Sequence, residues 1–172
     1  MKKTIPLFLA VASALFLSGL SATGKAKDSS SATDLFEGPL LDANGTEVSK
    51  DALAGKTIGI YFSAHWCGPC RSFTPKLVKF RDANTKDFEV VFVSLDHSSK
   101  AQMDYMNKTG MKWYTMPNRS SAANALAKKY GVRGIPALII VSPDGKTITK
   151  NGRGDVSSNA DGALKAWAKK SS

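Results

Sequence analysis

The ten residues from Phe62 to Arg71 read Phe-Ser-Ala-His-Trp-Cys-Gly-Pro-Cys-Arg and hold both cysteines of the chain, Cys67 and Cys70. The stretch just before Cys67, residues 57–62, is uncharged and rich in β-branched and aromatic side chains, which indicates a buried strand. After the cysteines, apolar residues recur at i, i+4 and i+7, and this spacing predicts a helix over residues 67–83. The cysteine pair is therefore expected where a buried strand gives way to a helix.

A purely structural role explains this pair poorly. A disulfide between Cys67 and Cys70 would close so short a ring that chain entropy gives it roughly 2 kcal/mol, against about 3 kcal/mol for a 15-residue loop. At a helix N-terminus, by contrast, unpaired backbone N–H groups stabilise a thiolate. We therefore expect Cys67 to be an exposed nucleophile and Cys70 to lie deeper on the same helical face, where it resolves a mixed disulfide. Gly68 leaves the approach open, and Pro69 suits a first turn that needs no N–H.

Outward from this centre the pattern alternates strands and helices. Strands are predicted over residues 88–95, 136–141 and 146–149, helices over 100–106, 122–129 and 159–170, and an N-terminal hairpin over 39–48 around Asn44-Gly45. The first two central strands should be parallel through a right-handed crossover, and the last hairpin antiparallel. The chain is therefore an α/β protein.

These residues resemble the thioredoxin superfamily from roughly Phe36 to Lys170. Besides the cysteine motif, Pro75 falls where that family has a helix-kinking proline, and Pro136 falls in the segment that carries its cis-proline. Residues 73–75 and 88–96 are closer to the tryparedoxin and nucleoredoxin branch. The long stretch between residues 96 and 118 is similar to that branch and to exported relatives of the TlpA/ResA type.

The resemblance implies a thioredoxin-like fold: a central mixed sheet flanked by helices, with an N-terminal hairpin extension and an insertion before the cis-proline segment. It also implies that the backbone of Ile135, beside cis-Pro136, pairs with an extended substrate segment, and that Trp66 forms a flat apolar rim near the sulfurs. Without the resemblance, Ile135-Pro136 is simply the start of a strand and Trp66 is a core residue.

Two positions depart from the family. Tyr61 stands where thioredoxins carry a buried aspartate, and Phe92 where they carry its companion lysine, so no proton path to Cys70 is assigned. His65 is open to two interpretations, as a cation that favours the thiolate or as an exposed bystander. His97 is expected in a loop.

Residues 1–24 have the layout of a secretory signal peptide, because two lysines precede an apolar run and small residues follow it. Cleavage is expected at about residues 20–26, which predicts a periplasmic or secreted protein. Residues 25–35 are polar and Ser-rich, which predicts a flexible linker, and residues 36–172 form the thioredoxin-like domain. An uncleaved amphipathic or core helix is the alternative at the N-terminus.

The composition bounds the remaining possibilities. The 172 residues (18.3 kDa, 42% hydrophobic) suffice for one core, and two cysteines exclude a four-cysteine zinc site. The 24 Lys and Arg against 14 Asp and Glu give a net charge of +10, but these cations are spread along the chain without an aromatic-basic stripe. We expect no nucleic-acid partner, no stable membrane insertion after cleavage, and a monomer.

The resulting hypothesis is an exported thiol-disulfide oxidoreductase without a bound cofactor or metal. It would act on disulfide-containing protein clients and be restored by an upstream dithiol donor. The Gly-Pro dipeptide between the cysteines resembles reductants, whereas an oxidising compartment favours a disulfide donor or isomerase. A Cu(I) metallochaperone using Cys67, Cys70 and a histidine, and a redox-inert binding module, remain as other classes.

Overall fold

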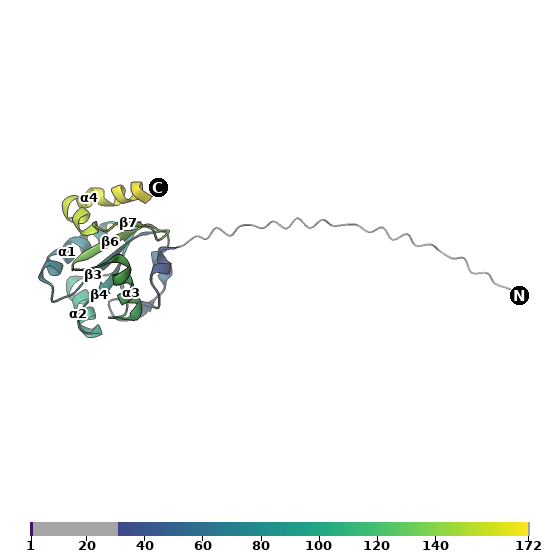
Figure 1. Ribbon diagram of the computed structural model, residues 1–172, viewed down its shortest axis with the longest axis horizontal. Helices are drawn as coiled ribbons and strands as arrows, with labels where there is room; N and C mark the ends of the chain where they lie inside the picture. Colours follow the sequence, from purple (N-terminus) through teal and green to yellow (C-terminus); the bar gives the residue numbers. More distant parts are fainter. Residues whose placement is uncertain (2–30, 172) are drawn as a thin grey trace.

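The computed structural model describes Met1 and residues 31–171, so the predicted signal peptide (beyond Met1) and the first part of the predicted linker lie outside the described residues. A seven-stranded mixed sheet in the order β2-β1-β5-β4-β3-β6-β7 forms the centre of the domain, with helices on both faces (Figure 1). The strands are β1 (Leu40–Leu41), β2 (Glu47–Val48), β3 (Thr57–Ser63), β4 (Phe88–Ser94), β5 (Tyr114–Thr115), β6 (Ala137–Val141) and β7 (Thr147–Thr149). The helices are α1 (Gly68–Ala83), α2 (Ser99–Thr109), α3 (Ser121–Tyr130) and α4 (Gly152–Ser171), with short 3-10 helices η1 (Ala32–Leu35) and η2 (Lys50–Leu53).

The pairing of the two central strands confirms the predicted α/β fold. β3 and β4 run parallel from the pair Thr57↔Phe88 to the pair Ser63↔Ser94, and every residue of both strands is buried. A parallel pair needs helices on both faces, which accounts for its largely apolar sequence; the buried Glu89 of β4 is paired with Arg81. β6 pairs antiparallel with β3, and β7 with β6, as the predicted C-terminal hairpin requires.

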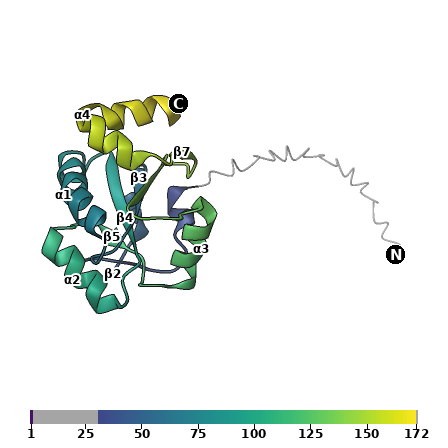
Figure 2. The same ribbon diagram turned by 60° about the vertical axis from the view of Figure 1, so that its left-hand side comes forward.

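Alternate residues of β3 enter two separate cores. Ile58, Ile60 and Phe62 pack on the face covered by α3 and the N-terminal segment, whereas Tyr61 packs on the face covered by α1, α2 and α4. Figure 2 shows α1 and α2 on one side of the sheet and α3 on the other. The two cores hold β3 in place from both sides, and the cysteine motif follows its last residue.

The N-terminal boundary of the domain differs from the prediction. Residues 31–35, assigned to the flexible linker, instead form the start of the folded domain, with Ser31 capping η1 through a reciprocal capping box with Asp34. The Ala32 N–H donates to the Pro143 carbonyl at 2.9 Å, and Ala32 and Phe36 are buried in the core under α3. Packing of these apolar side chains orders a stretch whose composition alone indicates a linker.

The C-terminal helix also differs from the prediction, because α4 begins at Gly152 rather than at residue 159. Asn159 has non-helical angles and divides α4 into two helical segments, and its side chain accepts the Gly162 N–H at 3.1 Å. Gly152 starts the first segment against β6, where a Cβ atom would lie 2.8 Å from the side chain of Ile140. The predicted start at residue 159 marks the second segment only.

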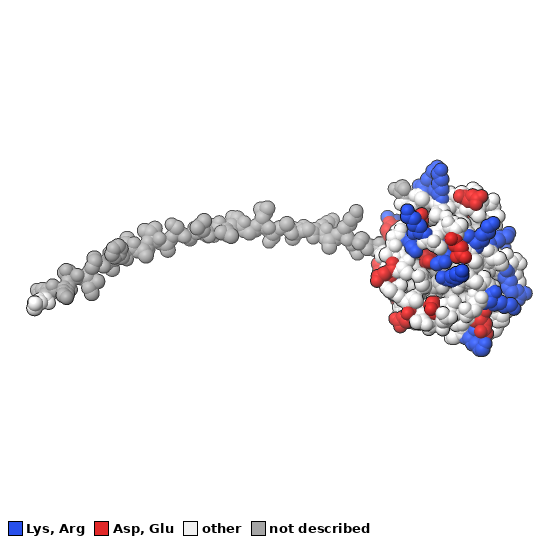
Figure 3. Space-filling view, turned by 180° about the vertical axis from the view of Figure 1, so that it is seen from behind, with Lys and Arg blue, Asp and Glu red and all other residues white. Residues whose placement is uncertain are grey.

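The surface carries charges of both signs. In Figure 3, Lys and Arg side chains are interspersed with Asp and Glu over the face shown. Among Met1 and residues 31–171, no helix has the length and apolar character that crossing a bilayer requires.

Gly59 provides a test of how closely β3 packs against the side chains of β4 and β6. A Cβ atom there would lie 2.8 Å from the Phe88 ring and 3.1 Å from Leu138, so we expect Gly59→Ala to lower the free energy of unfolding. Overpacking of this kind costs about 1–3 kcal/mol, measured by urea denaturation. Gly134→Ala is the matched control, because nothing lies within 4 Å of its added Cβ. Equal stabilities of the two variants would contradict this account.

Candidate active site

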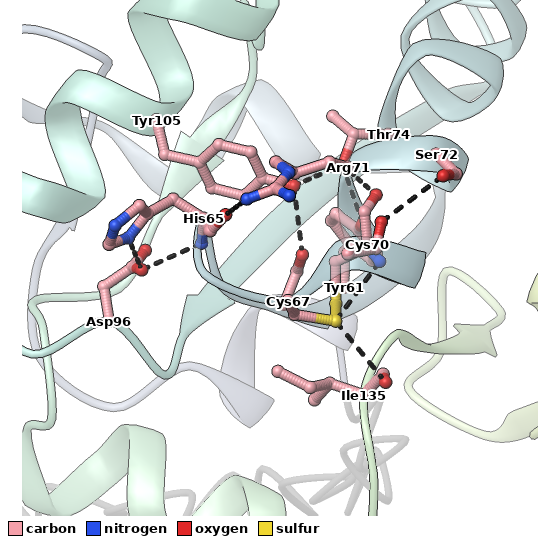
Figure 4. Close-up of a disulfide and its surroundings, with 12 residues drawn as sticks. Tyr61, His65, Cys67, Cys70, Arg71, Ser72, Thr74, Asp96, Tyr105 and Ile135 are labelled. Carbon is pink, nitrogen blue, oxygen red and sulfur yellow. Dashed lines mark hydrogen bonds and ion pairs between the residues drawn. A yellow bond between two sulfur atoms is a disulfide. The ribbon is translucent and has the colours of Figure 1, made fainter.

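The two cysteines form a disulfide at the N-terminus of α1, with their Cα atoms 5.2 Å apart. Cys67 is the N-cap residue of α1, so the helix begins at Gly68 and not at Cys67 as predicted. The Cys70 N–H donates to the Cys67 sulfur at 3.2 Å (Figure 4). Pro69 occupies the first turn, where its missing N–H leaves no helical hydrogen bond unmade. The sulfur of Cys67 therefore takes the place of a capping oxygen, at the positive end of the helix dipole.

The two sulfurs differ in burial in the predicted order but not to the predicted degree. Cys70 is fully buried and Cys67 is 6% exposed, while Gly68 and Pro69 beside them are exposed. The prediction of an openly exposed Cys67 is therefore wrong for this disulfide form. Its sulfur is bonded to that of Cys70 and lies 3.7 Å from the Ile135 carbonyl oxygen.

The segment around Pro136 lies directly against the disulfide, although it is 68 residues further along the chain. The Ile135–Pro136 peptide bond is cis, and Pro136 is buried while Ile135 is half-buried. The pairing of β6 with β3 ends at Phe62↔Ala137, so the backbone of Ile135 stands outside the sheet register. This places an unpaired stretch of backbone next to the Cys67 sulfur.

Hydroxyl groups stand behind Cys70 where the family carries a carboxylate. The Thr74 hydroxyl donates to the Cys70 carbonyl at 2.9 Å, and it lies 2.8 Å from the Tyr61 hydroxyl and 2.7 Å from the Tyr105 hydroxyl. Burial raises the pKa of Tyr61, so its hydroxyl stays protonated at neutral pH. Sequence reasoning singled out Tyr61 but missed Thr74, whose i+4 spacing from Cys70 was the available signal, and Tyr105, which only the folding of α2 brings near.

Trp66 is exposed to 49%, which excludes the core alternative for this side chain. Its ring stacks on His97, with the centroids 6.1 Å apart and the planes inclined by 15°. The Arg119 Nη2 donates to His97 Nδ1 at 3.1 Å. His97 therefore lies at the active-site surface, a position that its sequence context did not indicate.

Comparison with known proteins agrees with this geometry. A family profile described as thioredoxin-like matches residues 55–147. The chain belongs to the thioredoxin-like family. It is 41% identical over 133 residues to nucleoredoxin from Bos taurus, covering 74% of this chain and 30% of that protein. It is 42% identical over 132 residues to tryparedoxin from Trypanosoma brucei brucei, covering 74% of this chain and 90% of that protein.

The solved structure of thioredoxin from Wuchereria bancrofti matches with a TM-score of 0.66 and 47% sequence identity, covering 76% of this chain and 94% of that chain. Nucleoredoxin and tryparedoxin are thiol-disulfide oxidoreductases, and the predicted branch of the superfamily is confirmed. The chain spans only 30% of the length of nucleoredoxin.

His65 is exposed, as one of its two sequence interpretations expects, but it is not a bystander in this thioredoxin-like site. Its Nδ1 lies 2.5 Å from Asp96 Oδ1, which also accepts the His65 backbone N–H at 2.9 Å. Asp96 is fully buried, and its second oxygen accepts the Ser94 hydroxyl at 2.9 Å. In Figure 4 the His65 ring is turned toward Asp96 and away from the Cys67 sulfur. The histidine anchors the loop before Cys67 and is not placed to stabilise its thiolate directly.

The copper alternative finds no support in the arrangement of ligands. Among the residues that the structure describes, no group of three or more His, Cys, Asp and Glu side chains converges on one point. His65 is bound to Asp96, and His97 is stacked on Trp66. The described fold therefore does not bring a histidine to the cysteine pair.

The buried hydroxyl network makes a pH-dependent prediction. Tyr61→Phe should lower the free energy of unfolding at pH 7 by about 1 kcal/mol, because the buried hydrogen bond to Thr74 is lost. The raised pKa of Tyr61 in the folded state stabilises the wild type below pH 10, its ordinary value, and that contribution declines as the pH rises above 10. The two stability curves, measured by urea denaturation from pH 7 to 11.5, should therefore converge above pH 10 and then cross. Parallel curves would show that Tyr61 ionises equally in both states.

Proposed function

We propose that this thioredoxin-like chain is an exported thiol-disulfide oxidoreductase that reduces protein disulfides through Cys67 and Cys70. The observation that carries the proposal is the placement of the two sulfurs. The Cys67 sulfur accepts a hydrogen bond from the Cys70 N–H at the start of α1. Cys70 is fully buried behind it. Such an arrangement favours a thiolate at Cys67 and keeps Cys70 from reacting with anything except the sulfur of Cys67.

The reaction begins with the reduced pair. The Cys67 thiolate attacks one sulfur of a client disulfide, forms a mixed disulfide and releases the other client sulfur as a thiolate, which takes a proton from water. Cys70 then loses its proton and attacks the Cys67 sulfur. The second client thiolate leaves and the Cys67–Cys70 disulfide forms. Two electrons pass to the client, and an upstream dithiol restores the pair by the reverse exchange, so no bound cofactor is required.

Residues around the cysteine pair would support the reaction. The unpaired backbone of Ile135, beside Pro136, would align an extended client segment across the Cys67 sulfur. Trp66 offers an exposed apolar surface on the other flank of the motif. Because Tyr61 keeps its proton, we assign the proton released by Cys70 to solvent water.

Export rests on the sequence of residues 1–24, whose basic start, apolar run and small residues are typical of a secretory signal peptide. The mature protein would act as a monomer in the periplasm or outside the cell, with disulfide-containing proteins as clients and a dithiol protein as electron donor. In that compartment a reductant needs such a donor, because the surroundings favour oxidation.

Cysteine substitutions test the chemistry. We expect Cys67→Ser to abolish reduction of a protein disulfide such as that of insulin, because the nucleophile is lost. Cys70→Ser should also lose turnover but accumulate a mixed disulfide with its client, visible as a thiol-sensitive band on a non-reducing gel. Ser72→Ala, which alters an exposed hydroxyl on the same helix, is the control and should retain turnover. Turnover by Cys67→Ser would overturn the proposed function.

The redox potential of the Cys67–Cys70 pair tests the direction of electron transfer between the protein and its clients. Equilibration of the wild-type protein with glutathione mixtures should give a value near about −270 mV, as for thioredoxin. A potential above about −180 mV would instead assign the chain as an envelope disulfide donor or isomerase.

Export is tested separately. Expression of the full chain in a bacterium should yield, in the envelope or secreted fraction, a protein whose N-terminal residue by mass spectrometry falls between residues 20 and 27. A full-length protein retained in the cytoplasm would contradict this part of the proposal.

A further inference from the structure

A recess opens beside Trp66 and is not used by the thiol exchange described above. It has a volume of about 440 Å³ and is lined by Trp66, Ser94, Leu95, His97, Arg119 and Asn124. We propose that this recess binds a carboxylate side chain close to the reacting cysteine of a client, so that acidic disulfide-bearing segments are preferred. The inference rests on the proposed function and names the class of client segment.

Arg119 supplies the charge that such a side chain needs. Its guanidinium is fixed by two hydrogen bonds, from Nε to the Asp96 carbonyl at 3.1 Å and from Nη2 to His97 Nδ1 at 3.1 Å. Neither acceptor is a carboxylate, which leaves the remaining guanidinium N–H groups and the positive charge available. Arg119 is exposed and forms no ion pair with any carboxylate of the described residues.

Arg81 shows the contrast within the same protein. Its guanidinium donates to both carboxylate oxygens of Glu89, at 2.8 and 2.7 Å, and also to Asp82. The carboxylate nearest in sequence to the recess, Asp96, is fully buried and occupied by His65 and Ser94. Arg119 is thus held at the protein surface by two hydrogen bonds, and none of the described carboxylates forms an ion pair with it.

The position of the recess fits a residue beside the client cysteine. Trp66 lines the recess and directly precedes Cys67, and an extended chain advances about 3.3 Å per residue. We consider a client segment that is aligned along Ile135 with its cysteine at Cys67. The client residue one or two positions from that cysteine would then lie over Trp66. The stacked rings of Trp66 and His97 offer an apolar wall for the methylene groups of an Asp or Glu side chain.

Guanidinium groups suit this task, because their planar N–H groups match the two oxygens of a carboxylate. The preference should therefore depend on Arg119 and not simply on the net charge of the chain.

The test uses three synthetic peptides with the same disulfide-closed loop, differing only in whether Asp, Asn or Lys flanks one cysteine. The second-order rate constant for their reduction by the pre-reduced protein is measured by separating oxidised and reduced peptide. We expect the Asp peptide to react at least about threefold faster than the Asn peptide at low salt, and the Lys peptide more slowly than the Asn peptide. In Arg119→Gln the Asp-to-Asn ratio should fall to about one, and in Arg119→Lys it should be partly retained.

Lys86→Gln is the matched control, since Lys86 is an exposed cation in the loop before β4, at the end of the sheet opposite Cys67. It should keep the wild-type ratio. For the wild-type protein, raising the salt from about 20 mM to about 0.5 M should bring the ratio toward one, which tests the charge effect without a substitution.

The outcomes separate the two proposals. Efficient reduction of all three peptides at equal rates would overturn the acidic preference and leave the proposed function intact. No reduction of any peptide would overturn the proposed function itself. If Lys86→Gln weakens the preference for Asp as much as Arg119→Gln does, the preference comes from net charge. That result would overturn the role of the recess.

Discussion

The N–H of Cys70 points at the sulfur of Cys67 in the first turn of α1, and the rest of the domain holds that turn in place. A sulfur in the N-cap position is stabilised as an anion only if the helix start does not move. β3 leads into the turn and is fixed by β4 on one side and β6 on the other. The two cores on its faces bury every one of its residues. The reactivity of one sulfur thus depends on the rigidity of a central strand.

Behind that turn, neutral hydroxyls occupy the space where thioredoxins carry a buried carboxylate. The Thr74 hydroxyl is hydrogen-bonded to the hydroxyls of both Tyr61 and Tyr105, and it donates to the Cys70 carbonyl. A buried carboxylate is costly to desolvate when unpaired, whereas linked hydroxyls satisfy their own hydrogen bonds. The network therefore stabilises the helix start without placing a carboxylate behind Cys70.

Asp96 links this centre to the surface that clients would meet. Its carboxylate holds both the backbone and the ring of His65, one residue before Trp66. Its backbone carbonyl holds the guanidinium of Arg119, which in turn contacts His97 under the Trp66 ring. One buried residue at the end of β4 therefore positions both the loop that carries Cys67 and the recess beside it. Under the functions proposed above, that arrangement would join the exchange chemistry to the choice of client.

Short-range periodicity in the sequence predicted the central strands and the helix after the cysteines. The placement of the cysteines at the helix N-terminus predicted which of the two is more deeply buried. Folding decided what depends on residues far apart in the chain. Residues 31–35 have the composition of a linker, but the hydrogen bond from Ala32 to Pro143 makes them part of the folded domain. His97 lies in a loop, as predicted, but its contacts with Trp66 and Arg119 depend on the fold. His65 has a defined role only once Asp96 lies beside it. Such contacts arise from packing across the sheet, and no local periodicity records them.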